Sequence, residues 1–180
     1  GTVKTLSAIN VIDNLPLGSK VLVLCPKNVR LNWHHEIETF SQSNVRVTSL
    51  RGSQMQRLSA LVEAIKVKPD EISLAVLCYD SIAGMWDYLQ MAEWTATILD
   101  ESHLIRNPKT KRWQYVRRLR DKSKKRIIMT GTPYANSLND LYSQLEFLGQ
   151  GFSGFATFKA FKSFYGVYDK VDDKIEVLVG

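Results

Sequence analysis

The sequence predicts an α/β fold with a mainly parallel sheet and helices on both faces, and three observations support this prediction. Short, uniformly apolar runs recur along the chain, and such runs are typical of strands that are buried on both faces of a parallel sheet. Stretches of helical periodicity separate them, so strand and helix alternate as in βαβ units with right-handed crossovers. The 180 residues, 44% of them hydrophobic, are about one domain long and can bury a single large core.

The first half of the chain supplies the expected elements in turn. A helical apolar pattern covers residues 6–12, and an apolar strand follows over residues 21–25 and stops at Pro26. Residues 28–40 have helical spacing, with Asn28 as a possible cap and Trp33 as an expected core residue. Four further elements then alternate as strand, helix, strand and helix: residues 45–50, 55–65, 72–79 and 81–91.

The second half of the chain continues with two strands and an aromatic-rich end. Apolar strands are predicted over residues 96–99 and 126–129. Leucines at helical spacing then predict an apolar helix face: Leu138, Leu141, Leu145 and Leu148. Phenylalanines at similar spacing follow, and we interpret them as a packing stripe: Phe152, Phe155, Phe158, Phe161 and Phe164.

Basic residues are concentrated in one stretch of the chain. The sequence has 24 Lys and Arg against 18 Asp and Glu, a formal net charge of +6. Residues 106–126 alone hold eleven basic side chains and one acid, Asp121. Such a stretch is a candidate contact for a phosphate backbone, with an affinity that falls as salt is added. The alternative is a solvated face that only keeps the protein soluble.

The cysteines and the hydropathy pattern indicate an intracellular protein without a membrane partner. No apolar run is long enough to cross a bilayer, and no charged-then-apolar leader opens the chain. Cys25 and Cys78 each lie in an apolar, strand-like run without metal-type spacing, so we expect reduced core residues. The expected location is the cytoplasm for a bacterial or viral source and the nucleus for a eukaryotic one.

Two adjacent carboxylates, Asp100 and Glu101, follow the strand at residues 96–99. They fall at the carboxyl end of a predicted parallel strand, which is where open α/β sheets place their ligands. Adjacent carboxylates repel each other, so the pair favours a cation nearby, and hydrated Mg²⁺ fits that requirement. A plain surface turn after the strand is the alternative.

Two other segments carry groups that suit a phosphate ligand. Lys4 and Thr5 open the first predicted helix, where a lysine and helix amides can face phosphates and the threonine hydroxyl can reach Mg²⁺. Thr130 and Thr132 flank Gly131 at the end of the strand over residues 126–129, and their hydroxyls can donate to a phosphate or to a metal-bound water.

The ordered set of these motifs resembles the superfamily-two helicase-like ATPases, and among them the Swi/Snf family of DNA-dependent ATPases. Lys4-Thr5, the DEAH-like box over residues 100–103 and the run over residues 130–133 are similar to motifs I, II and III. Residues 24–26 and 32–36 are similar to motif Ia, and residues 100–107 and 130–141 are similar to the extended motifs II and III of the Swi/Snf family. The resemblance covers essentially the whole chain.

The resemblance implies an N-terminal RecA-like lobe of the P-loop NTPase type. The lobe would cover residues 1–166 and lack its first strand, and residues 167–180 would be a truncated segment leading toward a missing second lobe. The parent protein would be an ATP hydrolase that translocates on double-stranded DNA. Its arginines from the second lobe would complete the ATP site, so the fragment is expected to hydrolyse ATP poorly or not at all.

The resemblance also implies roles for individual residues around ATP and Mg²⁺. Gly1, Thr2, Lys4 and Thr5 would bind the nucleotide, with Lys4 on the β and γ phosphates, and Thr5 and Asp100 would hold Mg²⁺. The implied catalytic set is Asp100, Glu101 and His103, in which Glu101 would orient or deprotonate the attacking water. The implied coupling set, which would report the nucleotide state to the DNA surface, is His103, Thr130, Gly131 and Thr132.

Double-stranded DNA is the implied partner, contacted through its phosphate backbone and therefore largely without sequence preference. Residues in or near the family's DNA-contacting segments are Pro26, Lys27, Gly52 and Tyr79. The charge pattern adds Arg117 and Arg118, with Arg120 and residues 122–125 as further candidates.

One residue departs from the family pattern, and two other functions stay open. Val3 stands where the pattern has glycine, and a β-branched side chain there would crowd the phosphates. A catalytically silent DNA-binding or scaffolding module is therefore one alternative. The other is a related superfamily-two helicase or restriction-type motor, against which the segment around Trp33 and the extension Arg106-Asn107 argue.

Overall fold

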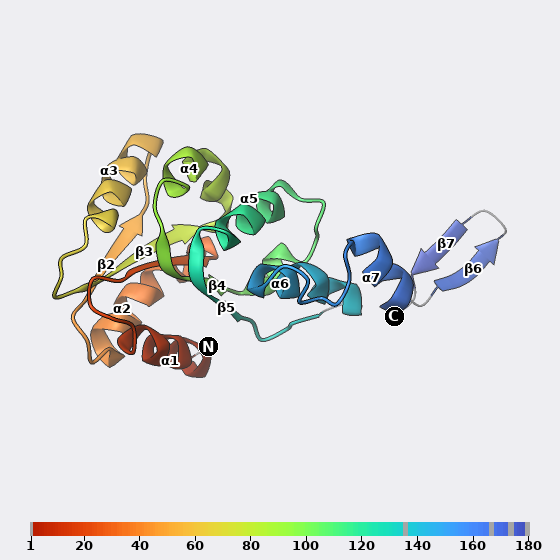
Figure 1. Cartoon of the computed structure of the whole chain (residues 1–180), viewed down its shortest axis with the longest axis horizontal. Coiled ribbons are helices and arrows are strands. Elements are labelled where there is room, and N and C mark those ends of the chain that lie inside the picture. Colours follow the sequence, from red (N-terminus) through yellow and green to blue (C-terminus); the bar gives the residue numbers. More distant parts are fainter. Residues whose placement is uncertain (1, 135–136, 166–167, 173–174, 179–180) are drawn as a thin grey trace.

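A five-stranded parallel sheet forms the centre of the molecule. The computed structural model describes residues 2–134, 137–165, 168–172 and 175–178 (Figure 1). The strands are β1 (Lys20–Cys25), β2 (Val45–Leu50), β3 (Ile72–Cys78), β4 (Trp94–Asp100) and β5 (Ser123–Met129). They pair in the order β2-β3-β1-β4-β5, and every neighbouring pair is parallel. The predicted parallel α/β architecture is therefore confirmed.

Helices cover both faces of this sheet, as predicted. Their bounds are α1 (Thr2–Asp13), α2 (Arg30–Phe40), α3 (Gln54–Ile65), α4 (Ile82–Leu89), α5 (Lys111–Arg120), α6 (Leu141–Leu148) and α7 (Phe158–Tyr165). One buried cluster joins α1 and α2 to the side chains of one face, among them Val23 and Ile98. The other cluster joins α3, α4, α5 and α6 to the opposite face, among them Leu24 and Leu99.

Burial on both faces explains why the central strands read as continuous apolar runs. All seven residues of β3 are buried, and so are Val21 to Cys25 in β1. Each fully buried Val, Leu or Ile contributes about 1.5–3 kcal/mol relative to an exposed one. Cys25 and Cys78 are free, buried and paired in register on β1 and β3, as expected of reduced core residues.

Short 3₁₀ segments connect several strands to the helices that follow. They are η1 (Lys27–Val29), η2 (Tyr79–Ser81), η3 (Ser102–Ile105) and η4 (Leu138–Asp140). The expectation that Asn28 caps the second helix is wrong, because Asn28 lies inside η1 and α2 begins at Arg30. Ser53 does cap α3, since its side chain accepts a hydrogen bond from the backbone N–H of Gln56.

Helix α6 does not bury the face that its leucines form. Leu138 is exposed and the other three leucines are only half-buried, whereas Ser143, Gln144 and Phe147 are buried. The buried polar side chains bind neighbouring loops: the Ser143 hydroxyl donates to the carbonyl of Arg106, and the Gln144 amide donates to the carbonyl of Pro133. Hydrogen bonding to these loops, rather than apolar periodicity, thus sets which side of α6 faces inward.

The expected aromatic stripe is partly confirmed. Phe161 is buried on α7 and contacts Tyr142 of α6, with their ring centroids 5.4 Å apart. Phe155 precedes α7 and packs against Phe161 at a centroid distance of 5.4 Å. Phe152 and Phe164 remain 66% and 70% exposed, although the Phe164 ring still packs against Phe155 at a centroid distance of 5.3 Å. The stripe therefore docks α7 on α6 without forming one continuous helix.

An antiparallel hairpin follows α7. Its strands are β6 (Tyr168–Asp172) and β7 (Ile175–Leu178), and it lies beyond α7, away from the main sheet (Figure 1). The predicted boundary between residues 166 and 167 falls outside the described residues. Within the part of the chain that the structure describes, no helix combines the length and the apolar character that crossing a bilayer requires.

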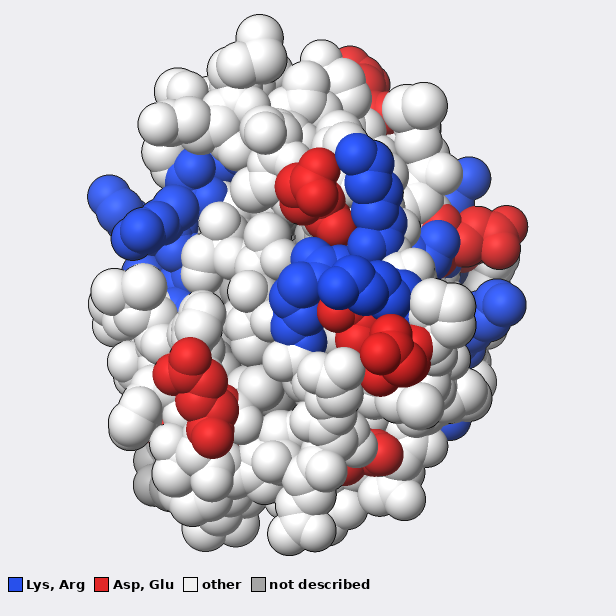
Figure 2. Space-filling model, turned by 90° about the vertical axis from the view of Figure 1, so that its left-hand side faces the viewer, with Lys and Arg blue, Asp and Glu red and all other residues white. Residues whose placement is uncertain are grey.

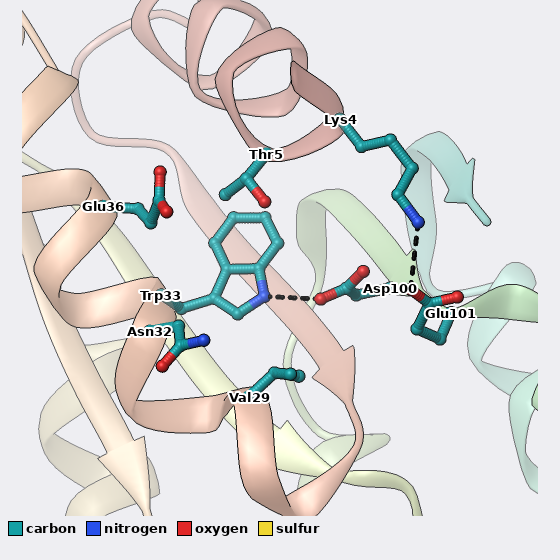
Figure 3. Close-up of a pocket in the computed structure, with 8 residues that line it drawn as sticks. All are labelled: Lys4, Thr5, Val29, Asn32, Trp33, Glu36, Asp100 and Glu101. Carbon is teal, nitrogen blue, oxygen red and sulfur yellow. Dashed lines mark hydrogen bonds and ion pairs between the residues drawn. The ribbon is translucent and has the colours of Figure 1, made fainter. Parts of the chain in front are cut away.

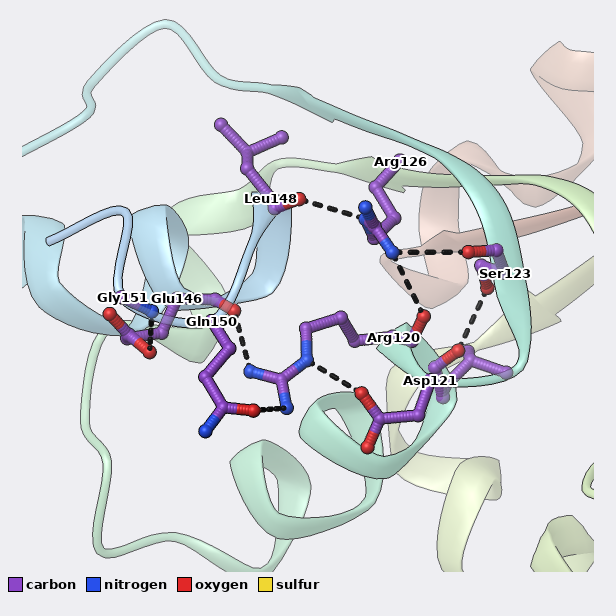
Figure 4. A network of polar contacts seen from close by, with 9 residues as sticks. Arg120, Asp121, Ser123, Arg126, Glu146, Leu148, Gln150 and Gly151 are labelled. Carbon is purple, nitrogen blue, oxygen red and sulfur yellow. Dashed lines mark hydrogen bonds and ion pairs between the residues drawn. The ribbon is translucent and has the colours of Figure 1, made fainter.

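Two arginines of the basic stretch hold the molecule together instead of facing a ligand (Figure 4). The buried Arg120 guanidinium donates to the carbonyl of Glu146, 3.1 Å away, and pairs with Asp121 at 2.8 Å. Arg126 donates to the carbonyl of Leu148, 2.8 Å away. Both side chains therefore attach the end of α6 to the turn between α5 and β5. The expectation that Arg120 contacts DNA is wrong, because its side chain is enclosed.

We expect Arg120→Gln to lower the free energy of unfolding by about 2–4 kcal/mol, because it strands a buried carbonyl and removes charge-assisted hydrogen bonds. The matched change Arg117→Gln, on an exposed residue of the same helix, should alter it by about 0.5 kcal/mol or less. Urea denaturation followed by circular dichroism measures both values. Equal losses in the two variants would contradict a structural role for Arg120.

Candidate nucleotide and DNA site

The chain reverses sharply at the acid pair. β4 ends at Asp100, and Glu101 takes a left-handed conformation with φ 52° and ψ 54°. It is the only residue other than glycine with positive φ among those that the structure describes. A non-glycine residue in this region is strained, and such strain is often found at functional sites. The turn keeps Asp100 buried on the α1 and α2 side of the sheet and leaves the Glu101 side chain partly exposed.

A chain of polar contacts joins the predicted site residues across three segments. The Lys4 ammonium lies 2.9 Å from Oε1 of Glu101, and Oε2 of Glu101 lies 3.2 Å from Nδ1 of His103. The same Nδ1 is 2.9 Å from the hydroxyl oxygen of Thr130, which in turn accepts a hydrogen bond from the backbone N–H of Thr132 at 3.1 Å. The structure thus brings the start of α1, the end of β4 and the end of β5 to one edge of the sheet.

The two carboxylates of the pair lie in different electrostatic environments. Burial alone would raise the pKa of Glu101, but the hydrogen bond and charge of Lys4, with His103, outweigh it and hold that pKa below its usual value. Burial raises the pKa of Asp100, although the hydrogen bond from Trp33 opposes the shift. Glu101 therefore stays ionised near neutral pH, and a cation beside Asp100 would offset the cost of burying its charged form.

Asp100 is held from two sides. The indole Nε1 of Trp33 donates to Oδ2 of Asp100 at 3.0 Å, and the hydroxyl of Tyr79 donates to the backbone carbonyl of Asp100 at 2.9 Å. Trp33 is 1% exposed and Tyr79 is 2% exposed. The Tyr79 side chain is therefore enclosed and supports the end of β4, and the segment around it stays a predicted DNA contact.

A cavity of about 260 Å³ opens between α1, α2 and the end of β4 (Figure 3). Its lining includes the predicted ligands Lys4, Thr5, Asp100 and Glu101. The remaining lining residues come from η1 and α2: Val29, Asn32, Trp33 and Glu36. Figure 3 shows the Thr5 hydroxyl, the Lys4 ammonium and the Asp100 carboxylate gathered around the same space.

These groups suit the magnesium complex of a triphosphate. Thr5 and Asp100 offer the hard oxygen ligands that Mg²⁺ prefers, and Lys4 offers a cation for phosphate oxygens. Among the described residues no group of three or more His, Cys, Asp or Glu could hold a metal ion. Mg²⁺ usually takes one or two carboxylates and completes its shell with water and substrate phosphates, so a larger protein cage is not required.

The start of α1 gives Val3 a helical backbone conformation, and Val3 is not among the residues that line the cavity. Val3 lies within the helix, which begins at Thr2, and its side chain is 78% exposed. The predicted ligand Gly1 lies outside the described residues. Gly131 lies close to Lys4, because a Cβ atom on this glycine would be 3.5 Å from the lysine ammonium. Val3 therefore has a helical backbone and points to solvent.

The residues predicted to contact DNA fall at two different edges of the sheet. Pro26, Lys27 and Gly52 follow the carboxyl ends of β1 and β2, on the edge that also carries Asp100. Arg117 and Arg118 lie in the last turn of α5, which leads to the amino end of β5; there the carbonyl of Lys122 accepts a hydrogen bond from Trp94. The structure does not bring this pair to the edge that holds Lys27.

Charge on the surface near β2 is mixed. Figure 2 shows the end of the molecule formed by β2, α2 and α3, where basic and acidic side chains are interspersed over a mostly uncharged surface. Arg46 in this region is paired with Glu71 at 2.9 Å. Basic residues here thus form no continuous patch.

Sequence reasoning missed the support that Trp33 and Gln144 give to the site. Trp33 was expected only to fill the core, and Gln144 was not singled out. Gln144 accepts a hydrogen bond from the Ser102 hydroxyl at 2.7 Å and donates to the carbonyl of Pro133 at 2.6 Å, so it joins the loops after β4 and β5. A polar residue between leucines on a predicted helix was the only available signal.

Comparisons with known proteins agree with this architecture. The family model described as "SNF2-related domain" matches residues 1–176. The chain is 33% identical over 127 residues to "Helicase SWR1" of Candida albicans, which covers 71% of the chain and 7% of that protein. It is 32% identical over 132 residues to "TATA-binding protein-associated factor BTAF1" of Arabidopsis thaliana, covering 73% of the chain and 6% of that protein.

A solved structure supports the same assignment. The SWI2/SNF2 ATPase core of Sulfolobus solfataricus in complex with dsDNA superposes with a TM-score of 0.63 and 29% identity, over 88% of this chain and 30% of that one. The chain therefore shares the RecA-like fold of that core. It spans only 6–8% of the length of the curated relatives it matches.

Proposed function

Since this chain belongs to the SNF2-related family, we propose that it is the N-terminal RecA-like lobe of a motor that hydrolyses ATP and translocates on double-stranded DNA. The observation that carries the proposal is the line of contacts from Lys4 through Glu101 and His103 to Thr130, beside the buried Asp100. Phosphoryl transfer depends mainly on positioning and on charge neutralisation, and these side chains supply both at one edge of the sheet.

The proposed roles follow from the positions of the groups. Lys4 binds the β and γ phosphates, the first amides of α1, including that of Thr2, face the same phosphates, and Thr5 and Asp100 hold Mg²⁺. Bound Mg²⁺ supplies charge neutralisation on the phosphate oxygens. Glu101, with its lowered pKa, accepts a hydrogen bond or a proton from the attacking water.

The Lys4 ammonium pairs with the Glu101 carboxylate at 2.9 Å. An ammonium that turns to a triphosphate gives up its carboxylate partner, so nucleotide binding frees Glu101 for the attacking water. Glu101 and Thr130 share Nδ1 of His103, so the same exchange alters the position of the loop over Thr130, Gly131 and Thr132. We propose this loop as the route by which nucleotide state reaches the DNA surface.

The domain organisation is part of the proposal. Residues 1–166 form the lobe, residues 167–180 lead toward a second RecA-like lobe, and that lobe completes the ATP site. The proposal is supported by the share of the Sulfolobus ATPase core, 30%, that the chain matches. A DNA partner implies an intracellular location, which is the nucleus in a eukaryote and the cytoplasm in a bacterium or a virus.

The test compares duplex-stimulated ATP hydrolysis and strand displacement in the longer protein that carries this lobe. Translocation on duplex DNA predicts hydrolysis that duplex stimulates, without separation of the strands. Strand separation would instead indicate a helicase. Absence of nucleotide binding and hydrolysis would leave the catalytically silent module, and the motor proposal would be wrong.

Lys27→Gln is expected to reduce the slope of log Kobs for duplex DNA against log salt by about 0.9. Binding through one phosphate contact fewer releases about one counterion fewer from the DNA. Pro26 and Gly52 lie at the same edge but carry no charge, so they do not contribute to this slope. Affinity should fall similarly for unrelated sequences, since backbone contacts carry no base information. Fluorescence anisotropy at several salt concentrations measures the slope. An unchanged slope would show that Lys27 does not contact DNA phosphates.

The same titration tests the second predicted DNA contact. If Arg117 and Arg118 bind phosphates, the double variant Arg117→Gln and Arg118→Gln should reduce the slope by about 1.8. If the double variant keeps the wild-type slope, Arg117 and Arg118 do not contact DNA and serve only as solubilising charge. The two sets lie at different edges of the sheet, so their effects on the slope should be additive.

A further inference from the structure

Trp33 aims its only hydrogen-bond donor at the acid pair. Its ring is buried at 1% exposure on α2, and Nε1 lies 3.0 Å from Oδ2 of Asp100, a residue 67 positions away in the sequence. A tryptophan that only fills a core can satisfy its N–H with any acceptor, such as a backbone carbonyl. Here the partner is a buried carboxylate, and a hydrogen bond donated to a carboxylate favours its charged form.

The hydrogen bond fixes the orientation of the carboxylate. Holding Oδ2 sets the rotation of the carboxyl plane and therefore the position of the other oxygen. Figure 3 shows that oxygen turned away from the indole, on the side of the cavity where Thr5 and Lys4 lie. The Tyr79 hydroxyl holds the backbone carbonyl of the same residue at 2.9 Å, so the main chain beneath the carboxylate is fixed as well.

We propose that Trp33 is a positioning residue that orients Asp100 for the magnesium ion of a bound Mg·nucleotide. The inference rests on the proposed function and adds to it a residue outside the acid pair. A carboxylate that is free to rotate must be ordered when the metal binds, and the cost of this ordering lowers the affinity for the metal. A carboxylate that is already held in place avoids this cost. Outer hydrogen-bond partners of metal ligands typically act in this way.

The variant Trp33→Phe removes the donor and keeps an aromatic ring in the core. Trp94→Phe is the matched control: Trp94 is also 1% exposed, and its Nε1 donates to the backbone carbonyl of Leu89 at 3.3 Å instead of to a carboxylate. Both changes lose one indole hydrogen bond and similar buried volume. They differ in whether the lost bond reaches Asp100.

The measurement is the affinity for ADP with Mg²⁺ and with EDTA, by calorimetry on the longer protein that carries this lobe. The ratio of the two affinities reports the metal contribution alone, apart from any catalytic step. We expect Trp33→Phe to reduce this ratio by about 10- to 100-fold. The affinity for metal-free ADP should stay near the wild-type value, and Trp94→Phe should leave both affinities unchanged.

Several outcomes would overturn the inference. A wild-type ratio in Trp33→Phe, or an equal reduction in Trp94→Phe, would show that Trp33 only fills the core. If Trp33→Phe does not fold, benzothienylalanine at position 33 keeps the ring shape and replaces the N–H with sulfur, and the same reduction is required of it. A wild-type protein that binds no nucleotide would instead contradict the proposed function, and the inference would fall with it.

Discussion

Glu101→Gln is expected to lower the duplex-stimulated kcat of ATP hydrolysis in the longer protein by about 10²- to 10⁴-fold, the usual contribution of a general base. The lowered pKa of Glu101 keeps its carboxylate ionised at neutral pH, so it can accept a hydrogen bond or a proton from water. An amide has a similar shape but cannot accept a proton. Steady-state hydrolysis at saturating Mg·ATP and duplex measures the effect.

Two measurements separate this chemical role from a loss of binding or folding. Affinity for Mg·ATP should change little in Glu101→Gln, because Lys4, Thr5 and Asp100 remain. Glu63→Gln provides the matched control, since the Glu63 side chain is 65% exposed on α3 and pairs only with Lys66. A Glu101→Gln variant that keeps its rate within about tenfold of the wild type would rule out the assigned role.

The second large effect concerns the 180-residue chain by itself. We expect it to hydrolyse ATP at least about a thousandfold more slowly than the longer protein with duplex DNA, because an arginine supplied from elsewhere is typically worth 10³–10⁵ in such sites. The lining of the nucleotide cavity includes a single cation, Lys4. Two arginines that follow β4 are in ion pairs: Arg112 with Asp80, and Arg106 with Asp140.

The comparison is a steady-state assay of both proteins with and without duplex DNA. The outcome separates the absence of a second lobe from a defect within this one. Since the Val3 side chain points to solvent, Val3→Gly should not restore turnover to the isolated chain. Substantial duplex-stimulated turnover by the chain alone would show that its own residues complete the site.

The sheet was predictable because strands buried on both faces must be apolar at every position. Residues 21–25 satisfy this condition fully, whereas residues 72–78 and 96–99 each contain one polar residue, Ser73 and Thr97, whose buried hydroxyl is hydrogen-bonded. Each run forms part of a strand of the parallel sheet. The gathering of Lys4, Asp100, Glu101, His103 and Thr130 at one edge could also be expected, because parallel strands end on the same side.

What could not be predicted depends on contacts between elements that are distant in sequence. The inward face of α6 is set by Ser143 and Gln144, which bond to loop residues 11 to 42 positions earlier in the sequence. Apolar periodicity contains no information about such hydrogen bonds. Likewise, Arg120 belongs by composition to a basic stretch, and only the fold shows that its guanidinium is enclosed by the end of α6.

The packing of Trp33 and Tyr79 illustrates the same limit at the site. Burial of Trp33 followed from its spacing, but the hydrogen bond to Asp100 depends on how α2 lies across the end of β4. Tyr79 directly follows β3, so a place at the edge of the sheet was predictable. The inward direction of its side chain was not, because residues at a strand end can turn either way.

The central claim is that this edge of the sheet binds Mg·ATP through Lys4, and calorimetric titration with a non-hydrolysable ATP analogue in Mg²⁺ tests it most directly. The account predicts saturable binding by the wild-type protein. In Lys4→Ala the affinity should fall at least about tenfold, the loss expected for one charge-assisted hydrogen bond of about 1.4 kcal/mol or more. Equal binding by both proteins, or no binding by the wild type, would contradict it.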